Sequence, residues 1–117
     1  LFIHSSDGTE VGPIYGPLVE GSNLRLTCTA EGGEPPPVVS WWNEGHPLDY
    51  HSPPGGPIIS TTVMASNLRV SNRLLIEPLS RYDMQRTFSC QASNNNLTSP
   101  LQSSVIIDMI REYLLVF

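Results

Sequence analysis

Three histidines, two cysteines and a few hydroxyl and carboxyl side chains are the residues in this sequence that could carry chemistry. His46 and His51 could bind zinc together with the cysteines, but structural zinc sites use closely spaced ligand pairs, and these histidines lie in a Gly/Pro-rich loop. Ser52, His51 and Asp49 contain the groups of a nucleophilic triad, but adjacent loop residues cannot adopt its mutual geometry. We expect solvated histidines (the third is His4), no metal, no cofactor and no enzymatic activity.

The two segments that carry the cysteines alternate strictly between apolar and polar residues. Residues 24–30 place Cys28 on an apolar face, and residues 87–93 do the same for Cys90. An unbroken period of two predicts a strand that is buried on one side only. The parity leaves open whether the cysteines form a bond or are two free core thiols, because unpaired cysteine is often buried.

Three further segments read as strands: 38–42, 73–76 and 103–107, all rich in apolar or β-branched residues. In the first of them, the alternation places Trp41 on the inward face and Trp42 on the outward face. A short edge strand is expected near Leu48 to Tyr50, and Asn94-Asn95-Asn96 is expected to form a hairpin turn, since asparagine tolerates left-handed backbone angles.

The composition agrees with many short strands and restricts the class of partner. Eleven prolines and nine glycines among 117 residues suit turns between strands, and about seven strands predict an all-β antiparallel sandwich. The formal net charge is −5, and the cations are six scattered arginines: Arg25, Arg69, Arg73, Arg81, Arg86 and Arg111. Nucleic-acid and anionic-lipid surfaces need a concentrated basic footprint, so we expect this domain to bind neither. No stretch of the sequence reaches the roughly 18 to 20 apolar residues that cross a bilayer, so we also expect no direct membrane insertion by this segment.

Several motifs with matching spacing and parity resemble the immunoglobulin superfamily. They are Leu24-x-Leu-x-Cys28, Trp41, Leu74-x-Ile76-x-x-Leu79 leading to Asp83, and Phe88-x-Cys90-x-Ala92. The resemblance implies an immunoglobulin-like sandwich in which a Cys28–Cys90 disulfide joins two sheets and packs on Trp41. Closing so long a loop stabilises the fold by about 4 kcal/mol on the chain-entropy estimate, and a lasting disulfide implies an oxidising, extracellular setting.

This sequence departs from the family pattern at the corner before the second cysteine. The family usually has a tyrosine two residues before that cysteine, and its hydroxyl bonds back to the corner. Phe88 occupies this position, so about 1 kcal/mol must come from packing instead. Asp83 lies one residue further from Cys90 than usual, which leaves its pairing with an arginine open.

A narrower set of motifs resembles arthropod Sidestep-type cell-surface receptors, and within them the second immunoglobulin domain. The segments are Val11-Gly-Pro, Glu20-Gly, Glu31-Gly-Gly-Glu-Pro-Pro-Pro, Trp41-Trp42, Asn72-Arg-Leu, the run from Cys90 to Pro100, and Val105-x-x-Asp108-Met. The resemblance implies a cell-recognition module of a multi-domain, membrane-anchored neuronal receptor for axon guidance, with a Beaten-path-type immunoglobulin partner. Nephrin-like adhesion proteins share the Gly-x-Pro-Pro run.

The expected organisation is one domain over 10–108, excised from a longer protein. Residues 1–9 are expected to be a lead-in, and 109–117 a tail or linker. After Asp108-Met109 the Sidestep-type pattern continues Asn-Leu-x-Pro, whereas this sequence continues Ile-Arg-Glu-Tyr. That departure leaves open whether the last eight residues are native linker.

Two surface features are candidates for recognition and modification. Outward-facing Trp42 would share its face with Ser89, Gln91 and Ser93, and with Tyr50 on the edge strand. Tryptophan is enriched at interface hot spots, so this face is a candidate for partner contact. The alternative role of Trp42 is structural, with its ring covered by neighbouring side chains. Asn96-Leu97-Thr98 is an N-glycosylation acceptor in the expected hairpin turn. Two other functions stay open: a passive spacer in an adhesion receptor, and a soluble immune-recognition protein.

Overall fold

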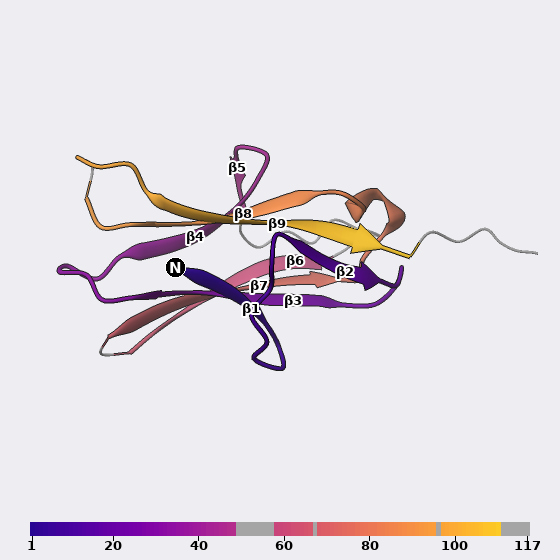
Figure 1. Cartoon of the computed structure of the whole chain (residues 1–117), viewed down its shortest axis with the longest axis horizontal. Coiled ribbons are helices and arrows are strands. Elements are labelled where there is room, and N and C mark those ends of the chain that lie inside the picture. Colours follow the sequence, from indigo (N-terminus) through magenta and orange to yellow (C-terminus); the bar gives the residue numbers. More distant parts are fainter. Residues whose placement is uncertain (49–57, 67, 96, 111–117) are drawn as a thin grey trace, which may run out of the picture.

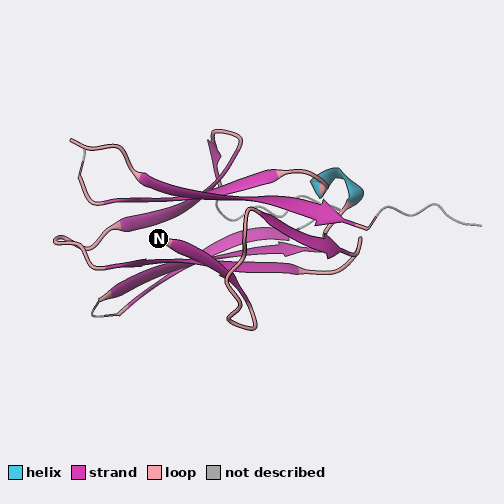
Figure 2. Ribbon diagram, in the orientation of Figure 1, coloured by secondary structure: helices cyan, strands magenta, loops and turns pink. Residues whose placement is uncertain are grey.

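The chain folds into a two-layer β-sandwich in the computed structural model (Figures 1 and 2), which describes residues 1–48, 58–66, 68–95 and 97–110. Four strands form one sheet and five form the other. The layers are the predicted all-β sandwich.

The four-stranded sheet has the order β1-β3-β7-β6, and its neighbouring strands are all antiparallel. Its strands are β1 (Phe2–Ser5), β3 (Leu24–Glu31), β7 (Arg69–Glu77) and β6 (Ile58–Ala65). β1 lies inside the expected lead-in and pairs with β3, with Ile3 buried in the core. The residues before 10 therefore contribute an edge strand to the sandwich.

The five-stranded sheet has the order β2-β9-β8-β4-β5. Its strands are β2 (Ile14–Leu18), β9 (Leu101–Met109), β8 (Thr87–Ser93), β4 (Val38–Asn43) and β5 (His46–Pro47). β2 pairs with β9 in parallel, so the sheet is mixed rather than wholly antiparallel. A short 3₁₀ turn, η1 (Arg81–Asp83), precedes β8.

The described edge strand, β5, covers His46–Pro47. The edge strand expected near Leu48 to Tyr50 lies mostly outside the described residues, which end at Leu48 on this side and resume at Ile58. Glu44 (φ 48°) and Gly45 (φ 84°) both have positive φ, which is the signature of a two-residue hairpin turn, so the return strand begins at once. Leu48 still donates its N–H to the carbonyl oxygen of Trp41 at 2.8 Å.

The connection between β8 and β9 is longer than the expected three-asparagine turn, because β9 begins only at Leu101. The side-chain oxygen of Asn95 accepts the backbone N–H groups of Leu97 at 2.8 Å and Thr98 at 2.9 Å. Asparagine therefore organises this loop through its side chain, as in an Asx turn. Asn96 lies outside the described residues.

The core lies between the two sheets and is formed by the inward residues of both. Its largest fully buried side chains are Trp41, Phe88, Leu24, Leu26, Leu74, Ile76, Leu79, Ile107 and Val105. The predicted parity is confirmed: Val39 and Trp41 are buried, whereas Ser40 and Trp42 on the same strand are half-buried. The alternate residues of each strand, most of them polar, therefore form the outer surfaces of the sheets.

Candidate partner-binding face

A disulfide between Cys28 on β3 and Cys90 on β8 joins the two sheets, with a Cα–Cα distance of 6.4 Å. This confirms the pairing that the family resemblance implied. Trp41 is fully buried beside it, since Trp41 is the register partner of Cys90 across β4 and β8. The bridge and the indole therefore occupy the same level of the sandwich.

Asn72 forms a second connection between the sheets that the sequence reasoning missed. It is the register partner of Cys28, and its backbone carbonyl accepts the indole N–H of Trp41 at 2.7 Å. Its side-chain amide donates back to the carbonyl oxygen of Val39 at 2.8 Å. The available signal was its parity, because Asn72 falls on the inward face of β7 with Val70 and Leu74.

The outward face of the five-stranded sheet is almost free of charge. Register pairs place small or amide side chains together there, with Ser89 opposite Ser104 and Gln91 opposite Gln102. On the described strands β4, β8 and β9, Asp108 is the one charged residue at an outward position. The outward positions are Val38, Ser40, Trp42, Thr87, Ser89, Gln91, Ser93, Gln102, Ser104, Ile106 and Asp108.

Trp42 is the one aromatic side chain at those outward positions, and it lies between β8 and β5. Its register partners are Ser89 on one side and Pro47 on the other. The indole N–H donates to the hydroxyl oxygen of Ser40 at 2.8 Å, and the residue is half-buried. One part of the ring is thus packed on its neighbours, and the rest faces solvent.

The structure brings together most of the predicted partner-facing residues. Ser89, Gln91 and Ser93 are half-buried on β8, on the same face as Trp42, and the Ser89 and Ser104 hydroxyls lie 2.9 Å apart. Tyr50 lies outside the described residues. The sequence reasoning missed the extension of this surface onto β9.

Apolar side chains mark both ends of this face. Val38 is 71% exposed at one end, and the parallel pair Ile14 and Ile106 is 61% and 39% exposed at the other. A hollow of about 450 Å³ is lined there by Ile14, Gln85, Ile106, Ile107 and Asp108. The face therefore has a centre of uncharged polar side chains with exposed apolar side chains at its two ends.

At the corner before β8, Asp83 is buried and pairs with Arg86, whose Nη1 lies 3.2 Å from Oδ1. The other carboxylate oxygen accepts the backbone N–H of Ser80 at 2.8 Å. Phe88, in the position where the family usually has tyrosine, is fully buried. The corner is therefore held by the carboxylate and by packing.

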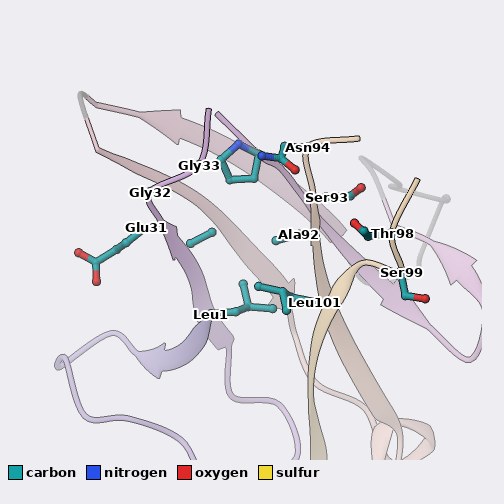
Figure 3. A pocket seen from close by; sticks show the side chains of 12 residues that line it. Leu1, Glu31, Gly32, Gly33, Ala92, Ser93, Asn94, Thr98, Ser99 and Leu101 are labelled. Carbon is teal, nitrogen blue, oxygen red and sulfur yellow. The ribbon is translucent and has the colours of Figure 1, made fainter. Parts of the chain in front are cut away.

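Another hollow of about 450 Å³ opens at the end of the sandwich where the β3–β4 and β8–β9 loops meet (Figure 3). Ala30, Ala92, Leu1 and Leu101 are among its lining residues, with hydroxyl and amide groups of the β8–β9 loop around them. The Glu31 carboxylate points away from it and pairs with Arg69 at 2.9 Å. No nucleophile and base are brought together among the described residues that line it.

The groups considered for metal or nucleophilic chemistry are not brought together in the part of the chain that the structure describes. His4 lies on β1 and His46 on β5, in different sheets, and both cysteines are in the disulfide. Asp49, His51 and Ser52 fall outside the described ranges. Within those ranges no group of three or more His, Cys, Asp or Glu side chains could hold a metal ion.

The described residues contain no helix of the length and hydropathy that a bilayer crossing needs. Leu97, in the predicted glycosylation motif that begins at Asn96, is 94% exposed, and Asn96 itself lies outside the described residues.

Comparison with known proteins places the fold. One family model, described as immunoglobulin domain, matches residues 10–94. A search of curated proteins found no match. A chain from the complex of Dpr2 Ig1–Ig2 with DIP-Theta Ig1–Ig3 has a TM-score of 0.63 and 15% identity, over 92% of this chain and 32% of that one.

Two further solved structures show the same fold. The full ectodomain of mouse nectin-like molecule 4 has a TM-score of 0.62 and 17% identity, over 92% of this chain and 32% of that one. A titin A168–A169 fragment has a TM-score of 0.59 and 14% identity, over 93% of this chain and 48% of that one. This chain thus spans about a third to a half of these neighbours. Since the family model matches most of the chain and agrees with the two sheets and their bridge, the chain belongs to the immunoglobulin domain family.

Proposed function

We propose that this domain is an extracellular cell-recognition module that binds another immunoglobulin-family protein non-covalently. The contact surface is the outward face of the five-stranded sheet, centred on Trp42 and the serine and glutamine side chains beside it. The observation that carries the proposal is the near absence of charge on this face, because interface cores are depleted in charged residues and enriched in aromatic ones.

The other sheet supplies the contrast. Its outward positions include Arg25, Glu31, Arg69, Arg73 and Glu77, as expected for a solvated surface. A domain of net charge −5 that keeps one broad sheet face nearly uncharged exposes a surface suited to burial against a partner.

The finer part of the proposal is a multi-domain, membrane-anchored neuronal receptor of Sidestep type with a Beaten-path-type partner. It is supported by the sequence motifs around Glu31 to Pro37, Trp41-Trp42 and Cys90 to Pro100. The Dpr2–DIP-Theta neighbour is itself a complex of immunoglobulin domains, which makes this class of partner a natural first choice. The disulfide supports an extracellular location.

A passive spacer is the second candidate, and Trp42 supplies the observation in its favour. Its indole N–H is already satisfied by Ser40, so the ring has a structural role without any partner. A spacer would only position a neighbouring domain, and its outward face would contribute nothing to affinity.

The experiment compares two variants of this face with a control on the other sheet. Trp42→Ala and Gln91→Arg alter the uncharged face, and Met64→Arg places the same charge on β6, where Met64 is 41% exposed. Each protein is displayed in multiple copies, because weak single contacts gain strength through avidity, and is tested against a panel of extracellular immunoglobulin-domain proteins that includes Beaten-path-type members. We expect both face variants to lower binding at least about tenfold and the control to bind normally. Equal binding by all three would establish the spacer instead.

A further inference from the structure

Arg25 and Arg73 are distant in the sequence but adjacent on the outward face of the four-stranded sheet. In the β3–β7 register, Arg25 is opposite Leu75 and Arg73 is opposite Thr27, so the two arginines are diagonal neighbours. Diagonal positions on one sheet face lie about 7 to 8 Å apart, within reach of long side chains. The fold therefore concentrates two of the arginines that are scattered along the sequence.

These two arginines differ from the other described ones in having no carboxylate partner. Arg69 pairs with Glu31 at 2.9 Å, Arg81 with Glu20 at 3.7 Å, and Arg86 with Asp83 at 3.2 Å. Arg25 and Arg73 are exposed and form no ion pair with any described residue.

Glu77 occupies the other diagonal position from Arg25, two residues from Leu75 on the opposite side to Arg73, but it forms no ion pair with Arg25. Adjacent like charges on a sheet disfavour folding, so a bound anion would stabilise the pair Arg25 and Arg73.

Two hollows adjoin each other and share both arginines. One, of about 320 Å³, is lined by His4, Ser5, Ser6, Gly8, Arg25, Thr27 and Arg73. The other, of about 340 Å³, is lined by Arg25, Ser60, Thr62, Arg73 and Leu75. No carboxylate lines either hollow among the described residues, and hydroxyl groups lie on both sides of the guanidinium groups.

The strand register arranges these groups in a line across all four strands. His4 is opposite Thr27, Thr27 is opposite Arg73, and Arg73 is opposite Thr62. A guanidinium group presents a planar fork of donors that matches the oxygens of a sulfate, and hydroxyls can bond to sugar hydroxyls on either side. A line of donors suits an extended anion better than a compact one.

We infer that Arg25 and Arg73 form a binding site for a sulfate-bearing polysaccharide on the outer face of the four-stranded sheet. Leu75 is the one large apolar side chain in the two linings, which disfavours a phospholipid surface or a protein hot spot there. The net charge of −5 repels polyanions at long range, but this repulsion is screened beyond about 8 Å at physiological salt. The inference rests on the extracellular location proposed above, but it uses the opposite sheet.

The test measures binding of the chain to a heparin-derived octasaccharide by calorimetry at 50 and 150 mM salt. The variant Arg25→Gln with Arg73→Gln removes the unpaired arginines. Its control, Arg69→Gln with Arg81→Gln, removes the same charge from arginines that are ion-paired. We expect at least a tenfold loss of affinity in the first and less than a twofold change in the second. The plot of log affinity against log salt concentration should become shallower by about two in slope for the Arg25 and Arg73 variant.

Several results would overturn the inference. They are no octasaccharide binding by the native chain at 50 mM salt, equal loss in the two double variants, or equal binding of an unsulfated hyaluronan octasaccharide. Binding to phosphatidylserine vesicles without octasaccharide binding would assign the face to membranes instead. Binding to the protein partner should be unchanged in the Arg25 and Arg73 variant, so that failure of this site and failure of the proposed function are told apart.

Discussion

Trp41 and Asn72 hold the two sheets together through a hydrogen bond of 2.7 Å between the indole nitrogen and the Asn72 backbone carbonyl oxygen. Their register partners are Cys90 and Cys28, so the covalent bridge lies at the same level as this bond. The Asn72 amide completes the connection by donating to the carbonyl oxygen of Val39. The spacing of the sheets is thereby fixed at the centre of the sandwich, directly beneath the proposed partner face.

Replacing Asn72 with alanine should destabilise the domain by about 1 to 3 kcal/mol. The substitution leaves the buried Val39 carbonyl without its side-chain donor, and the cost of an unsatisfied buried polar group falls in this range. Chemical denaturation measures the change. The matched control is Asn23→Ala, at an exposed position before β3, which should stay within about 0.5 kcal/mol. Equal effects at the two positions would contradict the role given to Asn72.

The two adjacent tryptophans should respond differently to phenylalanine. Trp41→Phe removes the bond to Asn72 and leaves space in a fully buried site, so we expect a loss of about 2 to 4 kcal/mol. Trp42→Phe removes a bond to Ser40 at a half-buried surface position and should cost less than about 1 kcal/mol. Denaturation of both variants under the same conditions gives the comparison. The assignment of inward and outward faces fails if the order is reversed.

Gly16 should not tolerate a side chain. Its φ is +142°, and a Cβ atom built there would lie 2.1 Å from the carbonyl oxygen of Asp108 on β9. Gly16→Ala should therefore cost more than about 1 kcal/mol and weaken the β2–β9 pairing. Faster amide exchange at Ile110, whose N–H donates to Leu18 at 2.7 Å, reports on that pairing. Gly12→Ala, with open space around the position, is the control and should leave exchange unchanged.

Asp7 should titrate far below an ordinary aspartate. A hydrogen bond from the Ser5 hydroxyl, then one from the Thr9 backbone N–H at 3.0 Å, lowers the pKa of Asp7 from 3.8 to about 2. Because the folded-state pKa is depressed, the stabilisation is complete above pH 3.8 and is lost as the pH falls toward 2. NMR titration of the carboxyl carbon measures the midpoint, which Ser5→Ala should raise toward 3.8. A native midpoint near 3.8 would refute this account of the turn.

Strands with strong alternation could be predicted closely from the sequence. Residues 87–93 coincide with β8 because Phe88, Cys90 and Ala92 mark one face without interruption. β1, β2 and β6 were not predicted. β2 contains Gly16 and Pro17, and in the edge strand β6 the run Ser60 to Thr62 interrupts the apolar residues on both faces, so neither shows a one-sided apolar pattern.

The residues of the candidate face could be predicted only where the alternation of inward and outward side chains within a single strand determines them. Trp42 could be placed outward from its neighbour Trp41, and Ser89 and Gln91 from Cys90. The adjacency of Arg25 and Arg73 depends on the register between β3 and β7, which no local pattern contains. The start of β5 depends on a positive φ at Glu44, a residue type that rarely adopts one.

The state of the two sulfur atoms in protein made by its native cells tests the central claim most directly, since the bridge between the sheets and the proposed extracellular recognition role both rest on a Cys28–Cys90 bond. The measurement is mass spectrometry after alkylation, with and without a reductant. We predict that neither cysteine is alkylated until the reductant is added. Alkylation of both cysteines without reductant would contradict the account.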